Sequence, residues 1–428
     1  METPMHDAII AALIDWNPWL EGPFPKELMG IERDYPISTF LAIPEIKILE
    51  GVRRSGKSTL LYQVVDHALQ EGKKVLYINF EDEVLKRYSL SEIYYAYLQR
   101  APVNYLLIDE IQHCIDWVPF IRKFYDRKIF DQIWITGSNT SLITKEYSEM
   151  LTGRNIKLLI MPLSFIEYLR FNGLSSIQRP LSREREVEIK RYFDKFLSIG
   201  SFPAITLRPV YQRELLINYF EDFLYKDIAT RHNVNVSKLK DLAIYLATHS
   251  AKIISYRNIA KALNLHPNTV ADYISYLKEI FLFDELYKFD YSLKKQYSND
   301  KKIYIIDTGL GNAVSFRFSE DKGRLLETIV YQALKQRKKE IYFHRSHKEC
   351  DFLIKEDLDI RFAIQVTYSL EDFETKEREI AGLIDAMKTY NLNEGIILTY
   401  NETDRFEIER GNSHFQISVQ PLWEWLLK

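Results

Sequence analysis

Nine residues near the start of the chain have the types and spacing needed to bind phosphate. Residues 51–59, GVRRSGKST, fit the pattern G-x-x-x-x-G-K-[ST] at each fixed position. In such a loop the glycines let successive backbone N–H groups turn toward phosphate oxygens, Lys57 reaches the β- and γ-phosphates, and Ser58 ligates Mg²⁺. The pattern therefore predicts a bound nucleoside triphosphate with Mg²⁺. The predicted nucleotide-binding residues are Gly51, Arg53, Arg54, Ser55, Gly56, Lys57, Ser58 and Thr59.

A pair of adjacent carboxylates supplies the second part of this chemistry. Asp109 and Glu110 directly follow the apolar residues 105–108. Asp109 is predicted to hold Mg²⁺ through water, and Glu110 to polarise the water that attacks the γ-phosphate. Because a GTPase normally orients that water differently, the pair favours ATP hydrolysis with Lys57 and Glu110 as catalytic residues. A solvated strand end is the alternative, but it does not explain why the pair accompanies the phosphate-binding pattern.

Strands and helices must bring these residues together. Residues 46–50 have the character of a short strand and residues 58–69 that of a helix, so the helix would begin at the phosphates. Residues 105–110 and 132–139 are apolar runs typical of a parallel sheet covered on both faces, and ligands bind beyond the carboxyl ends of such strands. The second run would deliver Ser138 or Asn139 as a sensor of the γ-phosphate, with an ordinary turn as the alternative. These elements predict an α/β fold of the P-loop NTPase type with helices on both faces of the sheet.

Taken together, the motifs resemble a family of archaeal and bacterial ATPases of the AAA+ superfamily that carry an uncharacterised C-terminal region with a winged helix and a nuclease-like fold. The resemblance covers most of the chain and rests on GVRRSGKST, LLIDEIQ, ITGSNTSLI, LTGR followed by IMPLSFIEYL, SIGSFPAI, GRLLETIVYQAL and ECDFLI. It implies that Arg154 is a candidate arginine finger, which contacts a phosphate or a subunit interface. A surface ion pair is the alternative for Arg154.

The composition indicates a multidomain globular protein. A chain of 428 residues exceeds the usual size of one core, and 46% hydrophobic with 27% charged residues excludes a disordered protein. No apolar run approaches the roughly 20 residues that span a membrane, and the N-terminal residues predict an amphipathic helix instead of a signal peptide. Two distant cysteines argue against a disulfide framework or a zinc site. We expect a cytoplasmic protein without membrane contact.

A helix-turn-helix pattern follows in the second half of the chain. Residues 254–263 and 267–278 have helical periodicity around a short turn, and residues 282–306 alternate like a β-hairpin with a polar tip at 298–300, which completes a winged-helix pattern. Net charge is −3, so DNA binding would depend on local basic patches such as the lysines and aromatic residues between 278 and 304. The candidate DNA contacts are Asn268, Thr269, Tyr273, Lys294 and Lys295. A protein-interaction or structural module is the alternative.

The last hundred or so residues resemble a restriction-endonuclease-like core. The expected elements are a helix at 325–334, strands at 340–344, 349–354 and 362–367, a further helix, and a strand at 394–399. Glu327 and Asp351 match metal-binding positions of active members, but Gln365 and Thr367 stand where Glu-x-Lys is required. We therefore interpret Glu327, Asp351 and Gln365 as a vestigial site in a docking or DNA-binding module. Arg345 and Lys348 are alternative sources of the missing charge.

These observations predict four domains and three alternative functions. The domains are an ATPase domain at 1–165, a helical lid or linker at 166–235, a winged helix at 236–310 and a nuclease-like α/β domain at 311–428. The favoured function is a Mg²⁺-dependent ATPase whose nucleotide state moves a DNA-binding C-terminal half, in DNA processing or maintenance. The alternatives are a signalling or scaffold NTPase that binds a protein partner, and an ATP-regulated nuclease. The pattern leaves the formation of a homo-oligomer open.

Overall fold

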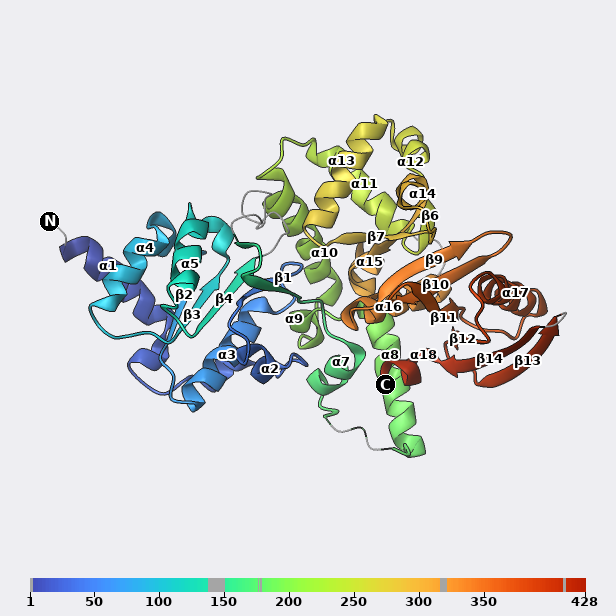
Figure 1. Ribbon diagram of the computed structural model, residues 1–428, viewed down its shortest axis with the longest axis horizontal. Coiled ribbons are helices and arrows are strands. Elements are labelled where there is room, and N and C mark those ends of the chain that lie inside the picture. The colour runs from blue at the N-terminus through green and yellow to red at the C-terminus, as the bar shows by residue number, and fades with distance from the viewer. Residues whose placement is uncertain (1–2, 138–150, 176, 178, 316–321, 411–412) are drawn as a thin grey trace. The chain divides into compact units, whose positions relative to one another are not determined.

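The computed structural model describes residues 3–137, 151–175, 177, 179–315, 322–410 and 413–428, and it divides into two compact units (Figure 1). The first unit is Met1–Ile160 and the second is Met161–Lys428. The boundary between them falls just after the last strand of the first sheet. Within the described ranges, no helix is both long and apolar enough to cross a membrane.

The first unit is built on five parallel strands in the order β2-β3-β4-β1-β5. The strands are β1 (Ile46–Glu50), β2 (Val75–Asn79), β3 (Tyr105–Asp109), β4 (Gln132–Gly137) and β5 (Asn155–Leu159). The helices are α1 (Thr3–Trp16), α2 (Ile37–Leu41), α3 (Lys57–Gln70), α4 (Leu90–Leu98) and α5 (Trp117–Asp126). A parallel five-stranded sheet with these helices is the fold of P-loop NTPases, so the fold class predicted for this part is confirmed.

The strands of this sheet are mainly apolar because both faces are covered, and β1 to β4 are buried along their whole length. Ile46 and Ile48 of β1 lie in one core cluster with side chains of α1, α4 and α5. Leu49 of β1 and Trp134 of β4 lie in a second cluster with side chains of α3. Each fully buried aliphatic side chain contributes about 1.5–3 kcal/mol. The double-sided core therefore fixes the carboxyl ends of β1, β3 and β4 at one edge of the sheet, where the predicted site residues begin.

The second unit contains two sheets. Its helices are α7 (Phe165–Phe171), α8 (Arg183–Ile199), α9 (Pro203–Thr206), α10 (Gln212–Asp222), a π-helical turn (Phe223–Ala229), α11 (Val236–Thr248), α12 (Tyr256–Leu263), α13 (Pro267–Glu279), α14 (Leu293–Ser298), α15 (Thr308–Val314), α16 (Lys322–Gln336), α17 (Phe373–Thr389) and α18 (Leu422–Leu426). The strands are β6 (Lys252–Ile254), β7 (Phe283–Tyr287), β8 (Lys301–Ile305), β9 (Glu340–Arg345), β10 (Glu349–Glu356), β11 (Asp359–Val366), β12 (Glu394–Thr399), β13 (Asp404–Arg410) and β14 (Ser413–Pro421).

The smaller sheet is antiparallel, in the order β6-β8-β7, and the larger one is mixed, in the order β13-β14-β12-β11-β10-β9. In the larger sheet β12 runs parallel to both β11 and β14, while the pairs β9/β10, β10/β11 and β13/β14 are antiparallel. Helix α17 packs on one face of this sheet, and α16 and α18 pack over part of the other. The last two strands and α18 were not anticipated from the sequence.

The expected hairpin at 282–306 differs from the observed structure in its middle. β7 and β8 do pair, but α14 lies between them in place of a simple turn. Asp290 precedes this helix and contacts its first turns: its carboxylate accepts from the Ser292 N–H at 2.9 Å, and its carbonyl oxygen accepts from Gln296 Nε2 at 2.5 Å. Lys294 and Lys295 therefore project from a short helix and not from a strand.

Candidate nucleotide-binding site

The phosphate-binding pattern forms the loop between β1 and α3. Gly51 has φ +146°, and a side chain there would put Cβ 2.1 Å from the carbonyl oxygen of Ile160, so the position requires glycine. Gly56 has φ +97° and directly precedes α3, whose first turn carries Lys57 and Ser58. The helix thus begins at the loop, where its unpaired N–H groups favour a bound phosphate.

Lys57 is held across this loop. Its Nζ donates to the carbonyl oxygen of Gly51 at 2.9 Å and to that of Val52 at 3.1 Å, and the residue is only 4% exposed. Burying an ammonium group is costly unless an anion or several acceptors surround it. A polyphosphate would supply that negative charge where the helix N-terminus also favours it.

The remaining loop residues lie beside Lys57. Ser55 is fully buried, and its Oγ has no hydrogen-bond partner among the described residues, which is the condition expected of a hydroxyl kept for a ligand oxygen. Arg53 Nη1 pairs with Glu81 Oε1 at 3.0 Å, Arg54 is exposed, and Thr59 is half-buried on α3. All eight predicted residues therefore belong to one loop and one helical turn, and their contact with a nucleotide stays a prediction.

A segment that precedes β1 supports the loop from outside. Arg33 Nη1 donates to the Ser55 carbonyl oxygen at 2.6 Å, and Gln63 on α3 accepts from the Arg33 N–H at 3.3 Å. Gln63 Nε2 in turn donates to the carbonyl oxygens of Met29 and Ile31, both at 3.0 Å. These bonds fasten residues 29–33 to the loop and to α3. Sequence reasoning missed Arg33 and Gln63, because neither residue lies in a recognisable pattern.

Asp109 is fixed by two hydroxyl groups at the end of β3. Tyr77 on β2 donates its hydroxyl proton to Asp109 Oδ2 at 2.7 Å, and the Thr136 hydroxyl on β4 donates to Asp109 Oδ1. The same Thr136 Oγ1 accepts from the backbone N–H of Glu110 at 3.0 Å. One threonine therefore connects both carboxylate residues to β4, the strand from which a sensor was expected. The sequence reading missed Tyr77 and Thr136 because their partners are distant in the chain.

Glu110 combines a strained backbone conformation with a carboxyl group whose pKa is raised. It adopts φ +52° and ψ +48°, a conformation that costs free energy for a residue with a side chain. Burial raises the pKa of its carboxyl group, Asp109 raises it further, and Lys57 opposes the shift. A carboxylate with a raised pKa is a stronger base toward a bound water molecule. Gln112 Nε2 donates to Glu110 Oε2 and holds the side chain in place.

Two sets of residues near the loop have the chemistry to hold a cation. Ser58 and Asp109, the predicted set, offer a hydroxyl and a carboxylate oxygen, which Mg²⁺ prefers. Glu81, Glu110 and His113 form a second set, whose ligand atoms all lie within 4.8 Å of one another. Imidazole suits transition metals better than Mg²⁺. The all-oxygen set therefore fits Mg²⁺ better.

Two further predicted catalytic residues are not brought to this site. Asn139 and the alternative sensor Ser138 lie outside the described residues. Arg154 directly precedes β5, and its carbonyl oxygen accepts from the N–H of Ile46, the first residue of β1. Because the loop follows the last residue of β1, Arg154 lies about 13 Å or more from it, at the opposite edge of the sheet. Its Nε instead pairs with Asp126 Oδ1 at 2.8 Å. The expectation that Arg154 contacts phosphate in its own subunit is wrong, and an interface role stays a prediction.

The candidate DNA contacts in the second unit lie on two helices. Asn268 is exposed and Thr269 half-buried at the start of α13, while Lys294 and Lys295 are exposed on α14. Tyr273 is 7% exposed, and its hydroxyl accepts from the backbone N–H of residue 235 at 3.0 Å. The expectation that Tyr273 contacts DNA is therefore wrong.

The basic stretch between 278 and 304 is also only partly at the surface. Lys302, Phe289 and Tyr304 are buried, so they do not belong to the expected basic and aromatic surface patch. Tyr291 and Tyr297 are exposed. The fully exposed part of the patch is therefore on α14 and just before it, while Lys288 and Lys301 are half-buried.

Lys302 occupies the centre of the vestigial site. Its Nζ lies 2.9 Å from Glu327 Oε1, 2.8 Å from Asp351 Oδ1 and 2.8 Å from Glu349 Oε1. Burial raises the pKa of Glu327 to about 7, Asp351 raises it too, and Lys302 opposes both. The cation beside these carboxylates thus comes from β8, and neither Arg345 nor Lys348 has an ion pair with them among the described residues.

Gln365 takes part in a second set of bonds at the same place. Its Oε1 accepts from the Asp351 N–H at 3.2 Å, and its Nε2 donates to Glu379 Oε2 on α17 at 2.5 Å. Asp351 Oδ2 also accepts from the Val366 N–H at 2.9 Å. The structure therefore brings Glu327, Asp351 and Gln365 together, and each carboxylate is already hydrogen-bonded within the protein.

Comparison with known proteins adds the relatives of the chain. A family model described as an AAA domain matches residues 44–169, and one described as a domain of unknown function, DUF8612, matches residues 190–321. The uncharacterized protein MJ1544 of Methanocaldococcus jannaschii is 33% identical over 422 residues, which cover 94% of this chain and 92% of that protein. The chain belongs to the MJ1544 family. Residues 44–169 of this MJ1544-family protein are accordingly an AAA domain of the P-loop ATPase type, and the loop and the carboxylates described above lie within it.

Other relatives of the MJ1544 family are more distant. An uncharacterized protein of Haemophilus influenzae is 27% identical over 400 residues, which cover 90% of this chain and 94% of that protein. Among solved structures, DnaA from Aquifex aeolicus bound to AMPPCP aligns with a TM-score of 0.27 and 19% identity, over 57% of this chain and 86% of DnaA. Thermotoga maritima RuvB aligns with a TM-score of 0.30 and 14% identity, over 58% of this chain and 86% of RuvB. These superpositions are too loose to transfer any property to the chain.

Proposed function

We propose that this protein is a Mg²⁺-dependent ATPase that couples its nucleotide state to DNA bound by the second unit, in DNA processing or maintenance in the cytoplasm. One observation carries the ATPase part of the proposal. The buried Lys57 ammonium lies across a glycine-rich loop, and the buried pair of Asp109 and Glu110 lies at the same edge of the parallel sheet. A structural loop would require neither the lysine nor the carboxylates.

Each residue has a role in this reaction. Lys57 would neutralise the β- and γ-phosphates, and Ser58 with Asp109 would hold Mg²⁺, which supplies positive charge to the same oxygens. Tyr77 and Thr136 orient Asp109, so this carboxylate does not need to reorganise when the metal binds. Glu110 would accept the proton of the attacking water, and its raised pKa favours that role.

The DNA part of the proposal is supported by the second unit. Apart from α14, the element order α11, β6, α12, α13, β7, β8 and the sheet order β6-β8-β7 are typical of winged-helix domains. Asn268 at the start of α13 is exposed, as expected of a helix that enters a major groove. Lys294 and Lys295 are exposed beside the Tyr297 ring, a combination that suits a phosphate backbone and its bases.

The two alternative functions receive unequal support. A nuclease is disfavoured, because the Lys302 ammonium fills the space between Glu327 and Asp351 and is itself 1% exposed. A substrate phosphate would find neither an accessible cation nor an open carboxylate there. A protein partner in place of DNA remains the second candidate, because winged helices also serve as protein-interaction modules. Whether the partner is DNA or a protein, α14 is the predicted contact surface.

Nucleotide-dependent DNA binding tests this proposal. Fluorescein-labelled single-stranded, duplex and branched DNA would be titrated with the full chain carrying Glu110→Gln, once with Mg²⁺-ATP and once with Mg²⁺-ADP. We expect one DNA form to bind at least about tenfold more tightly in one of the two states. Lys294→Glu/Lys295→Glu should abolish that binding, whereas Lys123→Glu/Lys128→Glu, an equal charge change on exposed lysines of the first unit, should not. Equal binding of every DNA in both states would overturn the DNA part and favour a protein partner.

A further inference from the structure

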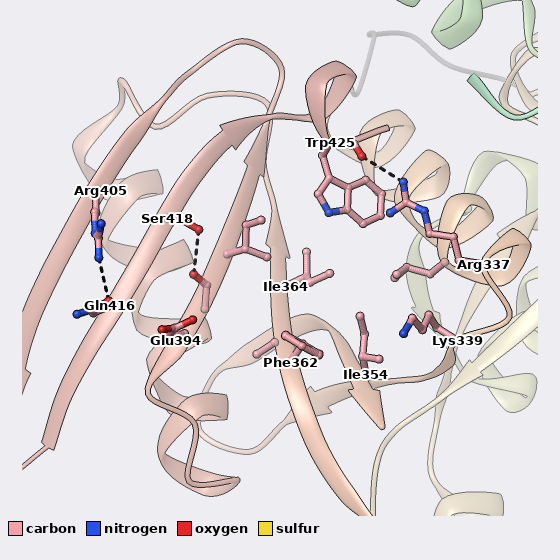
Figure 2. A pocket seen from close by; sticks show the side chains of 14 residues that line it. Arg337, Lys339, Ile354, Phe362, Ile364, Glu394, Arg405, Gln416, Ser418 and Trp425 are labelled. Carbon is pink, nitrogen blue, oxygen red and sulfur yellow. Dashed lines mark hydrogen bonds between the residues drawn. The ribbon is translucent and has the colours of Figure 1, made fainter. Parts of the chain in front are cut away.

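One face of the six-stranded sheet in the second unit is only partly covered. Helices α16 and α18 pack over one end of this face, and an open trough of about 610 Å³ crosses β14, β12, β11 and β10 at the other (Figure 2). Binding sites in proteins typically enclose about 300–1,000 Å³. The trough is therefore large enough to hold a ligand, and no step of the proposed ATPase cycle uses it.

The floor of the trough is apolar. Ile354 of β10 and Phe362 and Ile364 of β11 form it (Figure 2). Ile396 of β12 also lines the trough. Ile354 and Ile364 are nearly covered by their neighbours, but Phe362 is 53% exposed. A phenylalanine that stands on a sheet with half its surface in water is costly for the isolated unit, and covering it would be favourable.

Cationic side chains stand at both ends of this floor. Arg337 lies over the Trp425 ring at 4.0 Å from its centroid and donates to the Trp425 carbonyl oxygen at 3.1 Å. At the other end Arg405 donates to Gln416 Oε1 at 2.9 Å (Figure 2). Neither guanidinium has a carboxylate within 4.0 Å in the described part of the chain, so each retains N–H donors for an anion.

We propose that the trough binds an acidic, apolar peptide segment of a partner protein. Apolar side chains of the segment would cover Phe362 and the isoleucines, and a carboxylate at each end would pair with Arg337 or Arg405. Three inter-strand spacings of about 4.8 Å make the trough about 14 Å long, which an extended segment of about four residues spans. The expected motif therefore has two acidic residues that enclose two or three positions with apolar side chains.

The trough fits such a peptide better than single-stranded nucleic acid. Bases stack on aromatic rings, whereas this floor is mainly aliphatic, and Arg337 already covers a face of the Trp425 ring. Glu394 also lies within the trough, between the two arginines (Figure 2). A nucleic acid carries a charge at every phosphate and would meet this carboxylate, while a peptide can place a neutral residue there.

The site is separate from the surfaces used above. Its residues lie on the large sheet, on α18 and at the end of α16, whereas the proposed DNA contacts lie on α13 and α14. Peptide binding to the trough requires neither ATP nor DNA. This proposal can therefore hold or fail independently of the proposed ATPase function.

Selection from a random 12-residue phage-displayed peptide library on the immobilised full chain tests the proposal. We expect the recovered peptides to share two acidic residues around apolar positions. Synthetic fluorescein-labelled copies should lose affinity by about tenfold or more with Phe362→Ala and with Arg337→Glu. Leu358→Ala and Arg361→Glu are matched controls, because Leu358 is 83% exposed and neither residue lines the trough, and they should change affinity less than about twofold.

Several outcomes would overturn the proposal. Recovered peptides that are basic or neutral, or that bind the Phe362→Ala variant as well as the parent, would show that the trough does not recognise acidic segments. Failure to recover any common motif would do the same. A fluorescein-labelled 15-nucleotide oligo(dT) that binds the parent, but not Phe362→Ala, would assign the trough to single-stranded nucleic acid instead.

Discussion

Replacing Lys302 by methionine should destabilise the second unit strongly. The ammonium contacts three carboxylates at 2.8–2.9 Å, and Glu327 and Asp351 are buried with it. Lys302→Met keeps much of the side-chain volume but leaves both buried carboxylates without their cation. Breaking a buried ion pair in this way costs about 3–5 kcal/mol, which for a domain of this size lowers Tm by about 6–20 °C.

The loss should depend on pH in a defined direction. Burial is the main reason that the pKa of Glu327 is raised from 4.5 to about 7 in the folded unit. Between these two pH values the folded state binds a proton that the unfolded state does not. The stabilisation of the folded state that results is full below pH 4.5 and disappears as the pH rises through 7. Because the charge of Lys302 lowers the pKa of Glu327, removing Lys302 should raise that pKa further. Lys302→Met should therefore cost least near pH 5.5 and most near pH 8.

Calorimetric melting of the full chain at both pH values measures this effect, and the transition of the first unit serves as an internal reference. The triple variant Lys302→Met/Glu327→Gln/Asp351→Asn removes the three buried charges together and leaves the half-exposed Glu349. It should recover most of the lost stability, because no buried charge is then left without a partner. A loss below about 1 kcal/mol at pH 8 for the single variant, or a triple variant less stable than the single one, would refute the reasoning.

The nucleotide site yields further predictions. Glu110→Gln should keep ATP affinity within about twofold but lower kcat by about 10²–10³-fold in steady-state assays, and parental turnover would show that Glu110 is not the base. Because burial raises the pKa of Glu110, kcat of the parent should fall toward acid pH with a midpoint above 4.5, and a midpoint at or below 4.5 would contradict this assignment. Tyr77→Phe frees one oxygen of Asp109 and should raise the Mg²⁺ concentration for half-maximal turnover about three- to tenfold; an unchanged Mg²⁺ requirement would assign Tyr77 a packing role only. Gly51→Ala would set Cβ 2.1 Å from the Ile160 carbonyl oxygen, so it should lower the free energy of unfolding of the first unit by about 2 kcal/mol or more in urea titrations. An unchanged free energy of unfolding would show that the loop differs from the one described.

Local patterns in the sequence were sufficient to predict β1, β3 and β4 of the first sheet, whereas β2 and β5 were not anticipated. Residues 105–108 before the two carboxylates are wholly apolar, and the glycines and Lys57 lie within nine residues, so each signal is contained in one short segment. The same reasoning applies to α12 and α13. The spacing of Val270, Tyr273, Ile274 and Leu277 also predicts the buried face of α13, and it was the signal that would have excluded Tyr273 as a DNA contact.

Contacts between distant segments were not predictable in this way. Tyr77 and Thr136 meet Asp109 only because β2, β3 and β4 are neighbours in the sheet. Lys302 reaches Glu327 and Asp351 from another sheet, although its place in a basic and aromatic stretch indicated a surface residue. A lysine on a strand is normally solvated, and only the three-dimensional arrangement of carboxylates around it makes burial favourable.

The central claim is that Lys57, Asp109 and Glu110 form an ATPase site whose turnover responds to DNA. Steady-state ATP hydrolysis by the purified full chain with Mg²⁺, alone and with single-stranded, duplex or branched DNA, tests it most directly. We expect Mg²⁺-dependent turnover that Lys57→Ala abolishes and that one DNA form stimulates. Hydrolysis that persists in Lys57→Ala, that is absent from the parent under every condition, or that no DNA form changes would contradict the claim.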